Sequence, residues 1–262
     1  MRPGSFLTPD ISRAAWTVWR RNRDVFFKTY RVNFLPPMLE PVLYLIALGI
    51  GLGSFVGDID GVPYIRYIAP ALLAISAMNS AFFECTYGSF VRMYYMKTFD
   101  AMVSTPLTID EVIAGELLWG ATRSFIYVSI MLLILIIFGV VDVPASLLVI
   151  PFSFAAGLLF ASIGMCFTAL TPGIDELNYP SFLFITPMFL FSGTFFPLSV
   201  LPDPIRYLAL ALLPLAHVVT VTRSLTLTDI TPFILVSLGW IVLATAVFFL
   251  LAIHLMKKRL VT

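Results

Sequence analysis

One apolar stretch, residues 187–217, constrains what this chain can fold into more than any other part of the sequence. It is almost entirely apolar, yet Pro197, Pro202, Pro204 and Pro214 interrupt it. Proline removes an amide donor and clashes with the preceding helical turn, so a single helix cannot run through the stretch. In a membrane, irregular backbone is tolerated only where protein buries it or where it lines a wet cavity. The stretch therefore predicts a span that stops at a Ser-Gly-Thr sequence, followed by a short helix that dips back into the bilayer.

This re-entrant helix has recognisable ends. Asp203 directly precedes Pro204, and an aspartate N-cap followed by proline at the first helical position is a common start. Pro214 ends the helix, which leaves residues 204–213 to form it. A helix of that length rises only about 15 Å, half of the hydrocarbon core, so it does not cross the membrane. The side chains that we expect to shape an outer vestibule are Phe195, Phe196, Asp203, Arg206 and His217.

The bulk composition indicates a membrane protein. The chain is 60% hydrophobic and 12% charged, with a mean hydropathy of +0.97, outside the range of ordinary soluble domains. A net charge of +1 without a basic patch gives no indication of nucleic-acid binding. The first apolar run begins only at Phe34, too late for a cleavable signal peptide. Cys85 and Cys166 both lie in apolar runs, so we expect neither a disulfide framework nor a metal cluster.

Hydropathy and charge together predict the topology. Apolar runs long enough to cross a bilayer lie at residues 34–56, 67–92, 112–139, 146–170, 179–195 and 232–256. Lys and Arg concentrate before the first run, between the second and third runs, and after the last, which predicts that both termini are cytoplasmic. We therefore expect an all-α integral membrane protein with six transmembrane helices over residues 34–262, and a re-entrant extracytoplasmic helix between spans five and six.

Residues 1–33 are expected to form a separate cytoplasmic element, an amphipathic interface helix. The sequence Thr8-Pro9-Asp10 is a typical helix start. One helical face then carries Ile11, Ala15, Val18, Val25 and Phe26, whereas the opposite face is charged. This pattern indicates a helix on the inner membrane surface. The alternative is a soluble helix that packs on another domain.

The fourth apolar run carries a stripe of small residues at helical spacing. Its members are Ser153, Gly157, Ala161, Gly164 and Thr168. Small residues at this spacing allow helix backbones to approach closely in lipid. We interpret the stripe as a helix-packing surface, and the alternative is a lining for substrate.

The connection between spans two and three contains the sharpest local signal. Thr108 and Glu111 have the spacing of a capping box, which predicts that the third span begins near residue 109. Residues 94–104 before it are predicted to form a short cytoplasmic helix. So small a loop cannot bury the apolar side chains of this helix, which are Phe99, Met102 and Val103. Lys97 and Asp100 flank this apolar face. An exposed apolar helix implies a partner, unless it lies against lipid headgroups.

Several ionisable residues lie inside predicted spans, among them Glu40, Glu84, Glu116 and Arg123. Glu84 and Arg123 both fall roughly 12–15 Å from the same membrane face, on neighbouring antiparallel helices. An isolated buried charge is costly, so we expect the two to pair or to share a polar cluster, with Glu40 as a further candidate member. Such a pair serves either folding and helix register or contact with cargo, and the sequence leaves both open.

Motifs of catalysis are absent from the sequence. It contains no G-x-x-x-x-G-K-[ST], no G-x-S-x-G, no H-E-x-x-H and no C-x-x-C. We therefore expect no catalytic residue, bound cofactor or metal in this chain.

Several segments, in order and spacing, carry a resemblance to a known family. They are FVGDIDGVPYI after the first span, AISAM in the second, STPLT before the third, and SGTFFPLSVLP with LLPLAH near the end. The chain resembles the permease subunits of type-2 ABC exporters, and most closely the nodulation protein J type. The resemblance implies a homodimer in the bacterial inner membrane, bound to two copies of a separate ATPase that holds ATP and Mg²⁺. It also implies export of a lipid-linked or lipophilic oligosaccharide, with residues 94–104 as the coupling helix.

The sequence is also compatible with other functions. The permease could serve drug or antibiotic efflux, or pair as a heterodimer, because similar permeases handle different cargo. An ATP-independent channel or secondary transporter is the rival class, although an ion-coupled carrier usually needs titratable groups near mid-membrane. A membrane-bound transferase lacks any acid-rich or metal-binding loop to support it.

Overall fold

The computed structural model describes residues 9–59, 61–227 and 233–261, and nearly all of these residues are helical. The first half contains α1 (Ala15–Lys28), α2 (Tyr30–Tyr44), η1 (Leu45–Leu52), α3 (Gly53–Val56), β1 (Asp58–Ile59), β2 (Val62–Pro63), α4 (Tyr64–Phe83), η2 (Glu84–Gly88), η3 (Val91–Tyr95), α5 (Thr98–Val103) and α6 (Ile109–Ile137). The second half contains η4 (Ala145–Leu148), α7 (Val149–Leu170), η5 (Asp175–Leu177), α8 (Asn178–Pro180), η6 (Ser181–Ile185), α9 (Thr186–Phe191), η7 (Leu198–Val200), α10 (Asp203–Leu212), α11 (Pro214–Thr226) and α12 (Phe233–Val261).

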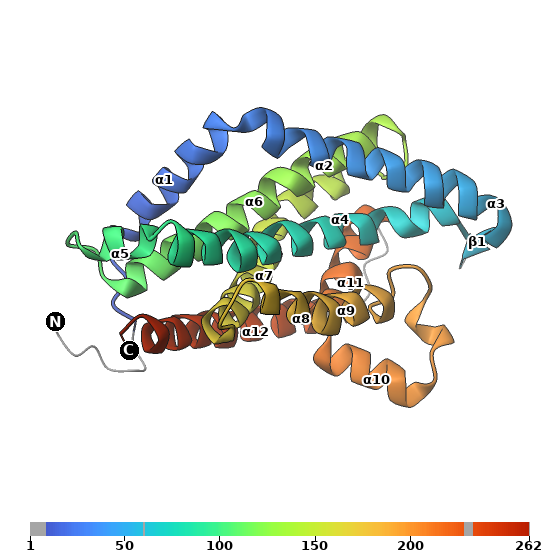
Figure 1. Cartoon of the computed structure of the whole chain (residues 1–262). Helices are drawn as coiled ribbons and strands as arrows, with labels where there is room; N and C mark the ends of the chain where they lie inside the picture. Colours follow the sequence, from blue (N-terminus) through green and yellow to red (C-terminus); the bar gives the residue numbers. More distant parts are fainter. Residues whose placement is uncertain (1–8, 60, 228–232, 262) are drawn as a thin grey trace.

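The helices form an elongated bundle around α4, which packs against α6, α7, α11 and η1 (Figure 1). The start of α1, the short α5 and the last turns of α12 lie at one end of the bundle. The β1–β2 hairpin and α10 lie at the opposite end (Figure 1). The hairpin is antiparallel, with Ile59 paired to Val62. The two termini of the described chain therefore approach the same end, as the sequence predicts.

Each of the six predicted apolar runs contains helix, but the helices differ in length. Among the described residues, four are long and apolar enough to cross a membrane: Tyr64–Tyr95, Ile109–Ile137, Ala145–Leu170 and Phe233–Val261. A fifth candidate is the pair α10 and α11, bent by 89°. The first run is helical through α2, η1 and α3 and contains the shorter apolar helix Val42–Val56, and the fifth run forms α8, η6 and α9. The all-helical membrane class is confirmed, and the six-span count stays a prediction.

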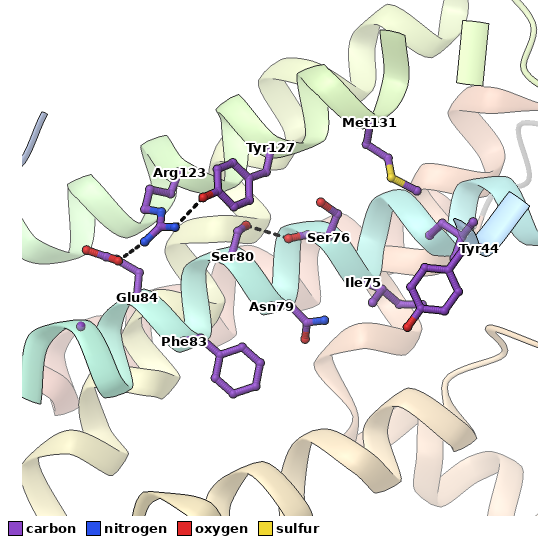
Figure 2. A pocket seen from close by; sticks show the side chains of 12 residues that line it. Tyr44, Ile75, Ser76, Asn79, Ser80, Phe83, Glu84, Arg123, Tyr127 and Met131 are labelled. Carbon is purple, nitrogen blue, oxygen red and sulfur yellow. Dashed lines mark hydrogen bonds and ion pairs between the residues drawn. The ribbon is translucent and has the colours of Figure 1, made fainter. Parts of the chain in front are cut away.

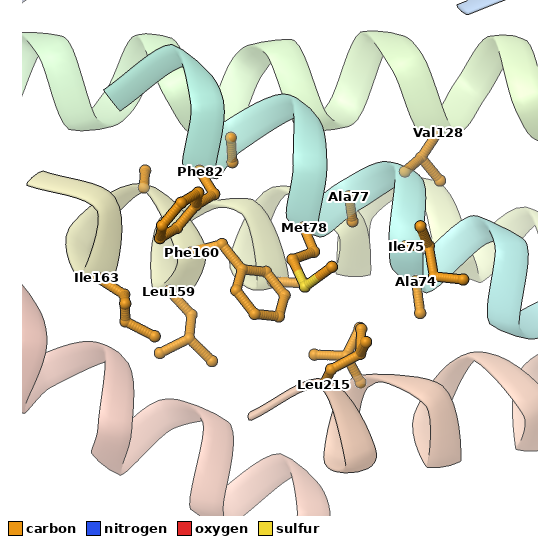
Figure 3. Close-up of a cluster of buried hydrophobic side chains, with 14 of the residues drawn as sticks. Ala74, Ile75, Ala77, Met78, Phe82, Val128, Leu159, Phe160, Ile163 and Leu215 are labelled. Atoms are coloured by element: carbon orange, nitrogen blue, oxygen red, sulfur yellow. The ribbon is translucent and has the colours of Figure 1, made fainter. Parts of the chain in front are cut away.

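The core of the bundle is apolar and centred on α4. Figure 3 shows Met78 and Phe82 of α4 beside Phe160 of α7, with Leu215 of α11 on the other side. All four side chains are fully buried. Burying a large apolar side chain contributes roughly 1.5–3 kcal/mol, so these contacts fix α4 between its neighbours.

The stripe of small residues on α7 lies at the closest helix contacts, which confirms its interpretation as a packing surface. A Cβ atom added at Gly157 would lie 2.4 Å from the Cβ of Ser124 on α6, and one at Gly164 would lie 2.8 Å from the carbonyl oxygen of Phe82 on α4. Hydrogen bonds cross the same contacts. The Ser124 hydroxyl donates to the Ser153 carbonyl at 2.9 Å, and the Thr168 hydroxyl donates to a carbonyl of η2 at 2.7 Å.

The predicted stop in the apolar stretch is present. Helix α9 ends at Phe191, and Gly193 has a φ of +73°, a conformation that side chains with a Cβ rarely adopt. The Gly193 carbonyl accepts hydrogen bonds from the Tyr67 hydroxyl at 3.3 Å and from Nη2 of Arg223 at 2.9 Å. Side chains from two other helices thus satisfy the broken backbone, as an apolar environment requires.

The helix after this stop begins one residue earlier than predicted. Helix α10 starts at Asp203 and Pro202 is its N-cap, so the prediction of Asp203 as the N-cap is wrong. Pro202 already has the extended backbone of a cap, and the Asp203 side chain makes no capping bond. Helix α10 ends at Leu212 with Leu213 as its C-cap, so it stops before Pro214 as predicted. Pro214 begins a second helix, α11, which is largely buried and continues to Thr226.

The N-terminal helix begins later than predicted. Helix α1 starts at Ala15, whereas the predicted start was at residues 8–10, of which Thr8 lies outside the described part. The residues before it are not helical and instead bond to the start of α6: the Asp10 amide donates to Asp110 at 2.9 Å. Ala15, Val18 and Phe26 of the predicted apolar face are buried, whereas Ile11 and Val25 are exposed. The apolar face of α1 therefore packs on protein, chiefly on α6.

The close contact between α6 and α7 yields a stability test. We expect Gly157→Ala to lower the thermal unfolding temperature of the purified protein, because the added methyl overlaps Ser124 and overpacking costs about 1–3 kcal/mol. Gly239→Ala on α12 is the matched control, since a Cβ there meets nothing within 4 Å. The control should leave stability unchanged or raise it by up to about 1 kcal/mol through helix propensity. Equal effects of the two substitutions would contradict the packing role of the stripe.

Candidate functional site

A buried ion pair joins α6 to η2, the π-helical segment that follows α4. Nη1 of Arg123 contacts Oε2 of Glu84, and the two side chains are mostly buried. The predicted pairing of these residues is confirmed. Glu84 is the first residue of η2, and π-helical segments of this kind often occur at functional sites.

A second arginine extends the pair into a network. Arg92 Nη1 lies 2.8 Å from Oε1 of Glu84, and Arg92 Nη2 lies 2.6 Å from Oε2 of Glu116. Two guanidinium groups and two carboxylates thus alternate across the interface between α6 and the end of the α4 span. Each charge has an opposite charge beside it, which offsets the cost of removing it from water.

Neutral side chains complete the hydrogen bonding of the network. The Trp119 indole donates to Glu84 at 3.0 Å, the Asn22 amide donates to Glu116 at 2.7 Å, and the Ser89 hydroxyl donates to Glu116 at 2.8 Å. On the other side, Arg123 Nη2 donates to the Tyr127 hydroxyl at 2.6 Å. Asn22 belongs to α1, so the network connects α1, α6 and the α4 span.

The sequence analysis missed Arg92 and Glu116 as members of this network. From the sequence, Arg92 was interpreted as a charge of the cytoplasmic connection because it lies at the end of an apolar run. Glu116 lies near the cytoplasmic start of its own run. The signal that finds them is their spacing, since each of the two helices carries one acid and one base about two turns apart. In antiparallel helices this order brings both pairs together. Glu40, the third predicted member, has a side chain outside the part that the structure describes.

Two cavities adjoin the network and share Glu84, Gly88 and Arg123 as lining residues. The first, of about 390 Å³, extends along α4 between α2 and α6. Figure 2 shows its polar end at Glu84 and Arg123 and its other end at Met131 and Tyr44. The second, of about 420 Å³, lies between α1, α6 and the last turns of the α4 span. The ion pair of Glu84 and Arg123 therefore forms the wall between two amphipathic cavities.

The predicted coupling segment differs from expectation in its exposure. Helix α5 covers only Thr98–Val103, and Phe99 is 0% exposed, so the prediction of Phe99 as an exposed docking residue is wrong. Phe99 belongs to the apolar core, and it lines a small pocket together with Ile109 at the start of α6 and Leu260 at the end of α12. Met102 and Val103 are half-buried against the same core. The exposed side chains of the segment include Tyr94, Tyr95, Met96, Lys97 and Asp100.

The junction of α5 and α6 is tied to both ends of the chain. The capping box of Thr108 and Glu111 is present, and α6 begins at Ile109 as predicted. The Ser12 hydroxyl before α1 donates to the Glu111 carboxylate, and Lys257 of α12 forms an ion pair with Asp110 at 2.7 Å. The start of α6, which follows α5 directly in the chain, is therefore bonded both to the segment before α1 and to α12.

The residues expected around an outer vestibule are only partly brought together. Asp203 and Arg206 are exposed and lie 4.0 Å apart, and Phe195 and Phe196 are half-buried. His217 is 2% exposed, so its prediction as a vestibule residue is wrong. Its ring stacks on Trp240 and bonds to the Leu210 carbonyl at 2.7 Å, which holds α10 and α12 to α11.

A bundle of apolar helices of bilayer length, with an internal network of paired charges, is the architecture of a multi-pass integral membrane protein. Comparison with known families agrees. Residues 13–227 match the model of the ABC-2 type transporter. The chain belongs to this family, whose members are membrane-spanning transport subunits.

Individual relatives extend the match over most of the chain. Nodulation protein J of Sinorhizobium fredii is 36% identical over 245 residues, covering 94% of this chain and 93% of the relative. Nodulation protein J of Bradyrhizobium diazoefficiens is 37% identical over 81% of each chain. The inner membrane transport permease YadH of Escherichia coli is 23% identical, covering 71% of this chain and 72% of the relative.

The charge balance of the network yields a second test. We expect Glu84→Gln to destabilise the protein by about 3–5 kcal/mol, because it leaves a buried guanidinium without its carboxylate. Glu84→Gln combined with Arg123→Gln should cost less than Glu84→Gln alone, since the charges balance again. Unfolding by denaturant in detergent micelles measures both.

An exposed pair provides the control for this experiment. Asp142 lies 3.4 Å from Arg66, and both side chains are more than a third exposed. Asp142→Asn should therefore change stability by only about 0–1 kcal/mol. A double variant that is less stable than Glu84→Gln would show that charge balance does not govern the network.

Proposed function

We propose that this chain is the permease subunit of an ATP-driven exporter, and that two copies form the export path together with two copies of a separate ATPase. The proposed cargo is a lipid-linked or lipophilic oligosaccharide or a similar amphiphile. The observation that carries this proposal is the match to nodulation protein J over more than nine-tenths of both chains. The cargo rests on the sequence resemblance to the nodulation protein J type.

The proposed location is the bacterial inner membrane, with both termini in the cytoplasm. The name of the YadH relative supports the membrane assignment. The distribution of charge supports the orientation, because most Lys and Arg residues lie at the α5 end of the bundle. Cytoplasmic ends of membrane proteins carry this excess. In this orientation α10 is a re-entrant extracytoplasmic helix, and its exposed Asp203 and Arg206 face the exit side.

In the proposed mechanism, α5 transmits the closure of the ATPase into the membrane. ATP and Mg²⁺ bind to the partner, and this chain supplies no catalytic residue. Contact is proposed through the exposed side of α5, with Lys97 and Asp100, while Phe99, Met102 and Val103 anchor the helix to its own bundle. The bonds of Asp110 and Glu111 to α12 and to the segment before α1 support this proposal, since they connect the start of α6, the helix that follows α5, to two other parts of the bundle.

The rival proposal is an ATP-independent channel or secondary transporter. The ionisable residues of the network are all in opposite-charge pairs, which leaves no single titratable group of the network to couple to an ion gradient. A second alternative is an ATP-driven permease whose cargo is a drug or an antibiotic. The family match supports the transport class and is neutral between these cargoes.

A matched pair of substitutions tests the contact with the ATPase. Ser104 at the end of α5 and Ser199 in η7 are both exposed and lie at opposite ends of the bundle. We expect Ser104→Arg to reduce co-purification of the ATPase and its stimulation by the permease. Ser199→Arg should leave both unchanged, and both variants should reach the membrane in normal amounts.

Both serines are exposed, whereas a substitution of the buried Phe99 would affect folding as well as docking. If both variants lost ATPase stimulation, the loss would not be specific to α5, and this result would contradict the proposed contact there. Full transport by the wild-type chain in vesicles without any ATPase would contradict the exporter proposal and favour the channel.

A further inference from the structure

The second cavity lies where α1 crosses the α5 end of the bundle. Its polar lining includes the guanidinium groups of Arg21, Arg92 and Arg123 and a single carboxylate, that of Glu84. The Trp119 side chain also lines it. Three positive groups and one negative group around one cavity are unusual in a protein interior, where charges are paired.

Pairing accounts for two of the three arginines. Arg123 pairs with Glu84, and Arg92 pairs with Glu116 behind the cavity wall and with Glu84. These four groups sum to zero charge. Arg21 is left as the excess positive charge of the cavity.

Arg21 lacks a carboxylate of its own. It is half-buried, and its guanidinium donates one hydrogen bond, to Oδ1 of Asn22 at 2.8 Å. Among the described side chains it forms no ion pair. Burial lowers the pKa of Arg21, as does the like charge of Arg92, while Glu116 opposes them. The environment is thus one in which a bound anion would stabilise the protein.

We propose that this cavity binds the phosphate of an anionic glycerophospholipid such as phosphatidylglycerol. One phosphodiester carries one negative charge, which matches the excess charge at Arg21. A guanidinium fork is suited to phosphate oxygens. Basic pockets between helices at a membrane face are known to bind anionic lipid headgroups.

The apolar surroundings favour a lipid over a soluble anion. Val25, Phe26, Val91 and Met96 also line the cavity. Val25 is 48% exposed and Met96 is 61% exposed, so an apolar surface continues from the cavity to the outside. Acyl chains would cover this surface, whereas inorganic phosphate would leave it uncovered. The proposal concerns a lipid bound to the permease itself and does not depend on the ATPase or on the cargo.

Native mass spectrometry of the purified full-length chain, titrated with phosphatidylglycerol or phosphatidylcholine, tests the proposal. We expect the wild-type chain to retain phosphatidylglycerol in preference to the zwitterionic lipid. Arg21→Gln should weaken phosphatidylglycerol binding about tenfold or more, as the loss of a charge-assisted hydrogen bond predicts. Arg21→Lys keeps the charge and should retain most of the binding.

Arg20→Gln is the matched control. Arg20 is the adjacent residue on α1 and is exposed, so the substitution removes the same charge from the helix without changing the cavity. If Arg20→Gln and Arg21→Gln lost the same amount of phosphatidylglycerol, the binding would reflect a general attraction to a basic helix, and the proposal would be overturned. Equal retention of the two lipids by the wild-type chain would also overturn the proposal, without the need for a variant. Displacement of phosphatidylglycerol by inorganic phosphate would show a phosphate site without lipid recognition, and would also overturn it.

Discussion

The pairing of charges inside an apolar bundle is the constraint on which the rest of this structure depends. Glu84, Arg92, Glu116 and Arg123 are mostly buried in the apolar bundle, where an unpaired charge is costly, and each has an opposite charge at hydrogen-bonding distance. That requirement fixes the register of α6 against the α4 span. Because an Asn22 amide completes the coordination of Glu116, the same requirement holds α1 against both helices. A single polar network thus positions the helices that border both cavities.

Features encoded locally could be predicted from the sequence. The capping box at Thr108 and the stop around Gly193 depend on a few neighbouring residues, and the stripe on α7 depends on a repeat of three to four residues within one helix. The pairing of Glu84 with Arg123 was also predictable, since the cost of an unpaired charge in lipid leaves few alternatives.

The errors concern contacts between segments far apart in the sequence. Phe99 is buried in a core that it shares with residues of distant helices, including Ile109 of α6 and Leu260 of α12 beside one small pocket, and no pattern within residues 94–104 contains that information. His217 is buried for the same kind of reason, since Trp240 of α12 covers it. The start of α1 was predicted too early because Asp10 bonds to the beginning of α6 instead of opening a helix. In each case a tertiary contact overrides a sound local preference.

The ion pair of Lys257 with Asp110 has a consequence for biosynthesis. Helix α12 is made last among the described helices, so during translation Asp110 lacks its lysine until α12 is in place. A nascent chain that ends before α12 therefore carries a carboxylate at the start of α6 without its ion-pair partner. The ion pair of Asp110 thus distinguishes a bundle that contains α12 from one that lacks it, before any other subunit is present.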